Sequence, residues 1–574
     1  MGERLRKIAD QPAAPGIVFL AQKSHVVAQP HQSIEQHPRF LPSLLQHIGI
    51  DQPEAAGQKC PLPGRQSVRR GFAAIEAKSS CAGGPKAFYC VSRGIAVVFA
   101  VTAELTRAPA FALSLGTPVT ISAPHANRRS AAAPHYGTTL LAAALTVAGF
   151  GLTVLLLYPG YLTNDATYVH GYIEDWHLGD WQSPLMTMVW WLIDPISPGP
   201  GSMFLLIVTL YWLGFGVIAL KVARRSAILA LAVPLLAFTP PAFILLSMIW
   251  RDILFSAVWL TAAAIVYAVA DRSGPLRRAV QLLALALIAF GILLRPNAIA
   301  AAPLLIAYAI WPARFEWKRA ALIFLPALIA GYGLVHLAYY EILQVKRENP
   351  LHSLLVFDLG GITHFTKENQ FPVSWSADEM ALLTSRCYEP QHWDSYWTLD
   401  PCKFVMARLE RPDDVIFGSQ RLVDAWKRAV TAHPLAYLQH RVTVLWTFLA
   451  VPNLTLELYN DETPLAHNVY LLALLPLHEA LKSTILYRAG SWLLLGVAIV
   501  GGAWPARRTP SGAFAISLAA AGIFYVMTFG LLGVATDFRY AHWGVVADLA
   551  ALVPALLAGR ERRSARALSG SPSP

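Results

Sequence analysis

One segment of the chain, residues 159–202, is acidic and could do chemistry. It contains no Lys or Arg, and its acidic residues are Asp165, Glu174, Asp175, Asp180 and Asp194. Asp165 lies a few positions after a long apolar run, and an amphipathic stretch, residues 185–193, follows the later acidic residues. If the amphipathic stretch folds back over the end of the apolar run, it gathers the carboxylates on one face. Carboxylates in such an arrangement can act as a general base or bind a divalent cation. The alternative is a solvated acidic loop with no further role.

Three arginines offer a complementary chemistry, because a guanidinium group can engage two phosphate oxygens at once. Arg251, Arg295 and Arg539 each lie at an end of an apolar run, away from the main groups of basic residues. The alternative is that each side chain snorkels to the membrane surface or pairs with a neighbour, as Asp252 allows for Arg251 and Asp537 for Arg539. Arg295 has no adjacent carboxylate, which favours a functional role. We predict a phosphate-binding site built from two of the three.

The elements that carry these residues are apolar runs long enough to cross a membrane. Of the 574 residues, 55% are hydrophobic and 14% are charged, and the mean hydropathy is +0.44. Soluble proteins carry about 25% charged residues, so an ordinary soluble protein is excluded. Spans of about 20 residues are predicted at residues 138–158, 203–220, 227–246, 253–270, 279–294, 298–311, 320–340, 485–503, 513–535 and 543–558. The runs 279–294 and 298–311 are short and could form one broken hairpin, and Pro240-Pro241 interrupts the run 227–246. The predicted fold class is an all-α polytopic membrane protein with about ten transmembrane helices.

Basic residues group at alternate ends of these runs. The groups lie at residues 128–129, 221–225, 272–278, 314–319, 507–508 and 560–566. With ten crossings they share one side of the membrane, which the positive-inside rule assigns to the cytoplasm together with both termini. The net charge of +11 is therefore largely a topology signal, and nucleic-acid binding is not expected. A Gly-rich nucleotide-binding element at a strand–helix junction is also absent from the sequence.

The runs divide the chain into segments of different character. Residues 1–125 lack a sustained hydrophobic period, which predicts a poorly structured extension or residues added by a start codon placed too early. The predicted segments after it are a transmembrane catalytic module at 138–340, a periplasmic loop domain at 341–484, transmembrane helices at 485–560 and a cytoplasmic tail at 561–574. Within the loop domain, residues 435–456 are amphipathic, and His440 and Arg441 favour an interfacial helix over a crossing.

Two cysteines of the predicted loop domain, Cys387 and Cys402, lie fifteen positions apart. In an oxidising compartment this spacing closes a disulfide worth about 3 kcal/mol. The alternative is two free thiols. A zinc site is not expected, because no paired His residues lie near the two Cys. We predict the disulfide.

The first outer segment resembles that of the GT-C membrane glycosyltransferases. The resemblance is carried by Asp165 just after the first span and by the later element Gly179-Asp180-Trp181-Gln182-Ser183-Pro184-Leu185. The resemblance extends over the layout of the chain from about residue 138 to 560. The family includes protein mannosyltransferases, aminoarabinose transferases and lipopolysaccharide-core sugar transferases. Two positions depart from the pattern: Ala166 stands where many relatives have Glu, and Ser183 where the first Pro of a pair is common.

The resemblance implies a bacterial inner-membrane enzyme with a periplasmic active site. The donor would be a polyprenyl-phosphate-linked sugar, transferred with inversion to a lipid, glycan or protein acceptor. Asp165 matches the family's catalytic Asp and would take the proton of the acceptor hydroxyl, since a sugar phosphate already has a good leaving group. Asp180 matches the second acidic position, which would orient the acceptor or the base, or hold a metal.

Further candidate substrate contacts are Glu174, Asp175, Trp181, His364 and Tyr540. The alternative for His364 is an ordinary surface position, and for Trp181 the aromatic belt at the membrane interface. Five acidic residues in one loop also allow a divalent cation, although they do not require one.

Two other functions fit a polytopic chain. A transporter or flippase for a lipid-linked sugar would be expected to show internal repeats and charges at the bilayer midplane. The two halves of this chain show no such repeat, and the charges gather at one face, which favours an enzyme. A polymerase or ligase of surface glycans would share the large outer domain.

Overall fold

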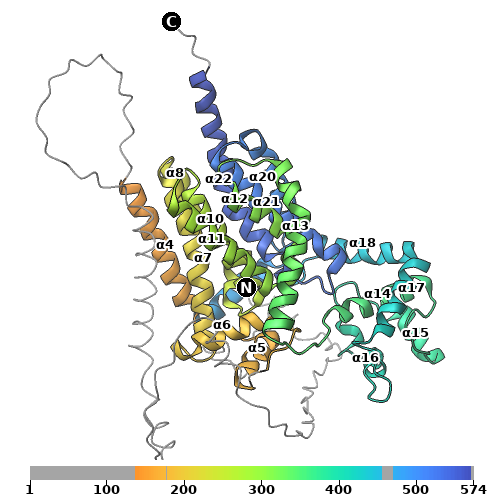
Figure 1. Ribbon diagram of the computed structural model, residues 1–574. Helices are drawn as coiled ribbons and strands as arrows, with labels where there is room; N and C mark the ends of the chain where they lie inside the picture. Colours follow the sequence, from red (N-terminus) through yellow and green to blue (C-terminus); the bar gives the residue numbers. More distant parts are fainter. Residues whose placement is uncertain (1–135, 176, 455–468, 570–574) are drawn as a thin grey trace, which may run out of the picture. The chain divides into compact units, whose positions relative to one another are not determined.

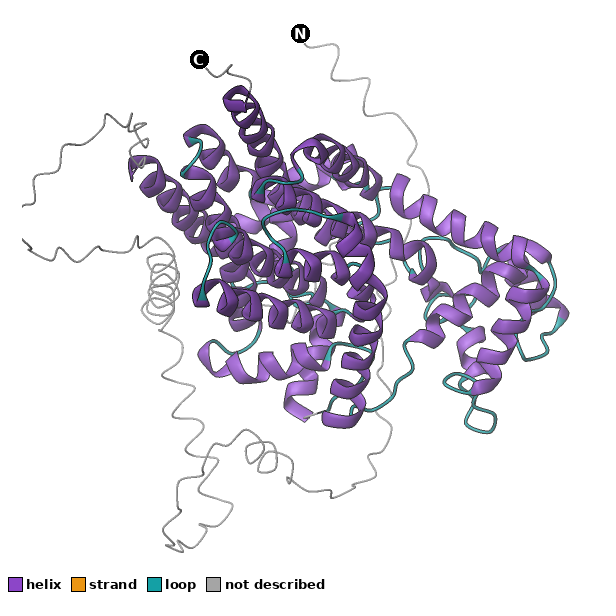
Figure 2. Ribbon diagram, turned by 45° about the horizontal axis from the view of Figure 1, so that its top comes forward, coloured by secondary structure: helices purple, strands orange, loops and turns teal. Residues whose placement is uncertain are grey.

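The computed structural model describes residues 136–175, 177–454 and 469–569, and these residues fold mainly into helices (Figures 1 and 2). Within these ranges, extended backbone pairs only at isolated bridges. The predicted N-terminal extension, residues 1–125, lies outside the described residues. The described part of the chain is therefore all-α, as the sequence predicts.

Eight helices in the described ranges are long and apolar enough to cross a membrane. They are α4 (Tyr136–Leu157), α7 (Pro200–Ala223), α10 (Arg251–Val269), α11 (Pro275–Leu294), α13 (Trp317–His336), α20 (Ala489–Ala503), α21 (Pro510–Leu532) and α22 (His542–Ser569). A π-helical turn extends α13 to Ile342, and a 3-10 turn, Phe538–Ala541, precedes α22. Most of their buried apolar side chains belong to one hydrophobic core. These features are consistent with a polytopic membrane protein.

Two of the ten predicted crossings are interrupted next to proline, which lacks a backbone N–H and so breaks the helical hydrogen bonds. α8 (Ala227–Leu236) and the segment Pro240–Ser247 meet at a bend of 54°, so they form a ninth crossing only as one broken span. The predicted run 298–311 becomes a 3-10 turn, Pro296–Ala300, followed by the short α12 (Ala302–Ile310). At 1.5 Å per residue, α12 is about 14 Å long, against about 30 Å of hydrocarbon. The described residues therefore hold eight or nine candidate crossings, against about ten predicted, and the difference lies at runs that the prolines interrupt.

The helix ends that carry basic residues lie together at one end of the bundle. The contacts join Lys221 to Asp271 at 2.6 Å, Arg225 to Glu561 at 3.9 Å, Arg560 to Ser226 at 3.1 Å, and the Phe315 N–H to the Arg507 carbonyl at 2.7 Å. This arrangement agrees with the prediction that the basic loops share one side for the groups within the described residues, whereas the group at residues 128–129 lies outside them.

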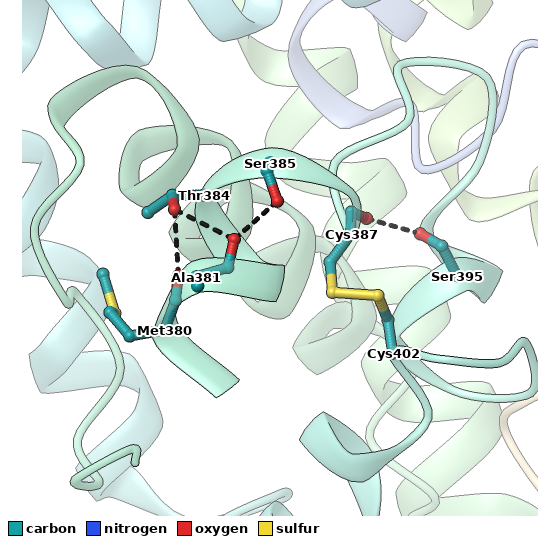
Figure 3. Close-up of a disulfide and its surroundings, with 7 residues drawn as sticks. All are labelled: Met380, Ala381, Thr384, Ser385, Cys387, Ser395 and Cys402. Atoms are coloured by element: carbon teal, nitrogen blue, oxygen red, sulfur yellow. Dashed lines mark hydrogen bonds between the residues drawn. A yellow bond between two sulfur atoms is a disulfide. The ribbon is translucent and has the colours of Figure 1, made fainter. Parts of the chain in front are cut away.

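A second hydrophobic core lies between α13 and α20 in the sequence, in a region that we call the loop domain (residues 343–450). Its helices are α14 (Leu351–Thr366), α15 (Ala377–Ser385), α16 (Phe404–Leu409), α17 (Gln420–Ala432) and α18 (Pro434–Ala450), and α19 (Val469–Leu481) follows it. A capping box starts α15: the Ser376 hydroxyl accepts from the Glu379 N–H, and the Glu379 carboxylate accepts from the Ser376 N–H. A disulfide joins Cys387 and Cys402, with Cα atoms 5.5 Å apart, which confirms the predicted pairing (Figure 3).

The polar residues that favour an interfacial position for α18 face the interior of the protein instead. His440 and Arg441 are 0% and 3% exposed, and they contact Asp358 of α14 at 3.2 and 2.5 Å. The exposed side of α18 includes an apolar stripe of Leu435, Leu438, Val442 and Trp446. An interfacial position remains a prediction, but the apolar stripe supports it rather than the polar pair.

Candidate active site

Two short helices after α4 bring the acidic loop back over one end of the bundle. α5 (Asn164–Asp175) holds Asp165 in its first turn, where a carboxylate interacts favourably with the helix dipole. The chain before α5 is fixed by a parallel bridge between Tyr161 and Met248, close to the start of α10. α6 (Pro184–Ile193) begins at Ser183, whose hydroxyl accepts from the Met186 N–H at 3.3 Å. These local elements hold Asp165 beside the start of α10.

A cavity that is open to solvent lies at this end of the bundle. The charged and amide side chains that line it are Asp165 and Gln182 of the first loop, Arg251 and Asp252 of α10, Arg295 at the end of α11, and Arg539 before α22. The structure therefore brings together Asp165 and all three arginines that the sequence singles out. Among these lining residues, three guanidinium groups face two carboxylates, so their net charge is positive.

The Asp165 carboxylate is shared between two partners. Its Oδ2 accepts from Arg539 Nη1 at 2.7 Å, and its Oδ1 accepts from Gln182 Nε2 at 3.1 Å. The side chain is still 42% exposed. Partial burial works to raise the pKa of Asp165, but Arg539, Arg251 and Arg295 outweigh burial and hold that pKa below its ordinary value of 3.8. Asp165 is therefore ionised at neutral pH and can accept a proton.

The three arginines are held in different ways. Arg295 is 7% exposed, and its guanidinium lies 4.9 Å from the centre of the Tyr540 ring. Arg251 donates from Nη1 to the Trp181 carbonyl at 3.0 Å. Arg539 pairs with Asp165 and also lies over the Trp250 ring, with 4.7 Å to its centre. Aromatic faces and a backbone carbonyl thus orient the guanidinium groups around the cavity.

Two carboxylates lie next to these arginines in the sequence, and only one of them pairs with its sequence neighbour in the structure. Asp252 contacts Arg295 Nε at 2.8 Å, although the sequence makes Arg251 its nearest candidate. Asp537 does contact Arg539, at 3.5 Å. Burial raises the pKa of Asp537 to about 6, although Arg539 works to lower it. Arg295, for which the sequence offers no partner, is therefore the arginine that is held by a buried carboxylate.

Asp180, the second predicted catalytic residue, is not among the residues that line the cavity. Its carboxylate accepts from the Glu348 backbone N–H at 2.6 Å and from the Tyr340 hydroxyl at 2.9 Å. The Trp181 ring contacts the loop domain, and only the Trp181 carbonyl reaches a cavity residue. The structure therefore places Asp180 and the Trp181 ring at a junction between segments rather than at the cavity.

The remaining predicted contacts are spread over the molecule. Tyr540 lies at the site, where its hydroxyl accepts from Arg539 Nη2 at 3.2 Å. His364 lies in α14 and does not line the cavity; its ring centre is 4.7 Å from that of Tyr388, and burial lowers its pKa. Two predicted contacts have side chains outside the described part of the structure: Glu174 and Asp175.

The structure brings further polar residues to the site that sequence reasoning missed. Gln182 belongs to the element that carries the family resemblance, so its position there was a usable signal. Asp394 of the loop domain does not line the cavity, but charges of the site act on it: burial raises its pKa, His392 and Arg539 lower it, and Asp165 raises it further. Asp394 is distant from Asp165 in sequence, and no local pattern connects the two.

Within the described residues, no group of three or more His, Cys, Asp or Glu is arranged to hold a metal ion. Comparisons of the chain with protein-family models, curated proteins and solved structures find no match. Fold and site together define the class of protein: a helical chain built for a membrane, with an arginine-lined cavity and an exposed, ionised carboxylate at one end of its bundle.

Proposed function

We propose that the chain is an integral membrane glycosyltransferase of GT-C type, which transfers a sugar from a polyprenyl-phosphate carrier to a lipid, glycan or protein acceptor. The observation that supports this most strongly is that Asp165, Arg251, Arg295 and Arg539 line one cavity. The reaction needs a base for the acceptor and cations for the leaving phosphate. Both kinds of group come from separate parts of the sequence, so their meeting is a property of the fold.

Asp165 acts as the general base in this proposal. The acceptor oxygen attacks the anomeric carbon of the sugar while its proton passes to the Asp165 carboxylate. The bond between the anomeric carbon and the phosphate oxygen breaks, and its electron pair leaves with polyprenyl phosphate. Attack opposite the leaving phosphate inverts the anomeric centre. Proton transfer to a positioned base contributes about 10²–10⁴-fold to such a rate.

The arginines bind the donor phosphate, and one of them links binding to catalysis. Arg539 is the cation that pairs with Asp165 in the structure. A phosphate that engages Arg539 competes for this guanidinium and brings a negative charge near Asp165. Both effects raise the pKa of Asp165 and make it a stronger base. Gln182 keeps the carboxylate oriented while this exchange takes place.

We assign the reaction to the periplasmic face of a bacterial inner membrane. The basic helix ends lie together at the end of the bundle opposite the cavity, and the positive-inside rule assigns basic ends to the cytoplasm. The loop domain then lies on the oxidising side, where a disulfide persists. From that side, Asp394 and its surroundings can contact the acceptor.

Binding of undecaprenyl phosphate tests the proposal before the sugar is known, because all donors of this class share a polyprenyl phosphate. Purified protein in lipid nanodiscs is titrated with undecaprenyl phosphate. Arg251→Gln and Arg539→Gln each remove a charge-assisted contact, so affinity should fall about tenfold or more in each. Arg488→Gln, at an exposed position before α20, removes the same charge outside the cavity and should bind as the wild type does. Equal affinity of all four proteins would refute the phosphate site.

A further inference from the structure

Glu348 lies in the linker between the π-helical end of α13 and α14, and it holds the first loop by several contacts. Its Oε2 accepts from the Trp181 backbone N–H at 3.1 Å, and its own backbone N–H donates to Asp180 at 2.6 Å. Its Oε1 lies 3.4 Å from His177 Nε2. Residues 178–183, which we call the strap, are thus fastened to this linker.

The strap also contacts the cavity. Gln182 donates to Asp165 at 3.1 Å, and the Trp181 carbonyl accepts from Arg251 at 3.0 Å. Trp181 is therefore held at its N–H by Glu348 and at its carbonyl by Arg251, and the next residue holds Asp165. A shift of the strap moves the partners of the base and of one arginine together.

A glycine in the strap leaves room for the Glu348 side chain. A Cβ at Gly179 would collide with the Glu348 carboxylate. Gly179 does not have a positive φ, and it pairs with Lys346 in a parallel bridge, so its backbone conformation is open to other residues. A side chain at position 179 would therefore displace the Glu348 carboxylate without straining the backbone.

The strap carries a contact with the loop domain as well. The ring centre of Trp181 lies 5.3 Å from that of Trp397 and 6.0 Å from that of Trp393, both in the loop domain. The linker that holds the strap leads directly into α14, the first helix of that domain. A displacement of the loop domain would therefore reach the partners of Asp165 and Arg251 through the strap.

We propose that Glu348 is a positioning residue of the transfer reaction: it fixes the strap so that Gln182 orients Asp165 and the Trp181 carbonyl orients Arg251. Glu348 acts through the strap and touches neither substrate nor reacting atoms. The catalytic part of this inference rests on the proposed function, whereas the mechanical part, the fixing of the strap, can be measured without it.

Two substitutions that disturb the same contact from opposite sides test the inference. Glu348→Ala removes the carboxylate, and Gly179→Ala displaces it. Each should raise amide hydrogen exchange in the strap and weaken undecaprenyl phosphate binding by about tenfold. Because both substitutions act on one contact, the double variant should lose no more affinity than the single variant that binds more weakly. Glu348→Gln keeps an oxygen that can accept from the Trp181 N–H, so it should recover most of the affinity. Glu341→Ala, at an exposed side chain near the end of α13, is the matched control and should change neither quantity.

The outcomes separate positioning from general destabilisation and from failure of the proposed function. Additive losses in the double variant, or strap exchange at the wild-type rate in Glu348→Ala, would overturn the positioning role. Exchange that rises equally in all helices, with no recovery in Glu348→Gln, would overturn it too. If the wild type itself does not bind undecaprenyl phosphate, the proposed function fails, and the exchange data still decide whether Glu348 fixes the strap.

Discussion

The molecule holds two centres in which a carboxylate meets an arginine, and they differ in their exposure. In the loop domain, Asp358 contacts Arg441 at 2.5 Å and His440 at 3.2 Å, and the three side chains are 1%, 4% and 0% exposed. At the cavity, Asp165 meets Arg539 at 2.7 Å, but these two side chains are 42% and 18% exposed. We call them the closed centre and the open centre.

Enclosure, and not the type of residue, distinguishes a structural joint from a candidate active site. Arg441 also donates to the Gly533 carbonyl at 2.7 Å, so the closed centre joins α14 and α18 to the end of α21. Burial lowers the pKa of His440, which favours its neutral form inside the joint. The closed centre cannot exchange partners without unfolding, whereas the open centre can give up Arg539 to a phosphate. Substitutions at either centre test this difference.

The largest effect should come from breaking the closed centre. Asp358→Ala leaves Arg441 buried without its carboxylate, so the free energy of unfolding of the loop domain should fall by about 3–5 kcal/mol. Amide hydrogen exchange in α14 and α18 measures this loss. Asp413→Ala, at a side chain that is 73% exposed, should change stability by less than about 1 kcal/mol. A loss for Asp358→Ala no larger than that of the control would show that the closed centre is not a structural joint.

The next effect concerns the disulfide of the loop domain. Replacing both Cys387 and Cys402 by Ala removes a cross-link over fifteen positions, which should lower the free energy of unfolding by about 3 kcal/mol. Denaturant unfolding of the double variant and of the reduced wild type measures it. Binding of undecaprenyl phosphate should persist below the lowered melting temperature, because the cross-link lies outside the open centre. An unchanged free energy of unfolding would mean that the stability of the loop domain does not depend on the disulfide.

At the open centre, Arg539→Gln should change a pH profile. Partial burial raises the pKa of Asp165, and Arg539 is the strongest of the three arginines that lower it. Without Arg539 the pKa of Asp165 rises, and because a base works only when deprotonated, the acidic limb of kcat/KM should move to higher pH. An acidic limb at the wild-type pH would show that Arg539 does not set the charge of Asp165.

The smallest effect is expected at Asp180, which lies outside the cavity. Asp180→Asn keeps an oxygen that can accept from Glu348 or Tyr340, so kcat/KM should fall less than about tenfold and the acidic limb should stay in place. A general base or a metal ligand at this position would lose about 10²-fold or more. A loss on that scale would restore to Asp180 the catalytic role that the family resemblance implies.

Most of the fold could be predicted because hydrocarbon thickness sets the length of each apolar run. The exceptions contain proline: Pro240 divides one run, and Pro296 shortens the next helix to α12. The sequence marks both breaks by these prolines, because a missing backbone N–H interrupts the helical hydrogen bonds. The disulfide could be predicted from spacing alone, because both cysteines belong to one domain.

Sequence reasoning could locate those residues of the site whose position follows from where a helix begins or ends. Asp165 and the three arginines lie at helix ends, which the apolar pattern locates. The pairing of Asp252 with Arg295 depends on how α10 packs against α11, which no local pattern encodes. Glu348 and Asp394 come from segments that tertiary folding alone brings near the first loop.

The most direct test of the central claim is sugar transfer by the wild type and by Asp165→Asn. Undecaprenyl-phosphate sugars labelled in the sugar are incubated with each protein in nanodiscs and with a membrane extract as the source of acceptors. Asp194→Asn is the control, since Asp194 belongs to the same loop, accepts from the Gly199 N–H at 2.9 Å and does not line the cavity.

The account predicts that the label moves from the carrier to an acceptor with the wild type and with Asp194→Asn. In Asp165→Asn, transfer should fall by about 10²–10⁴-fold while undecaprenyl phosphate still binds. Transfer by Asp165→Asn at a near-normal rate would contradict the account. A label that stays on its carrier with the wild type, and only crosses the bilayer when the protein is placed in vesicles, would contradict it as well.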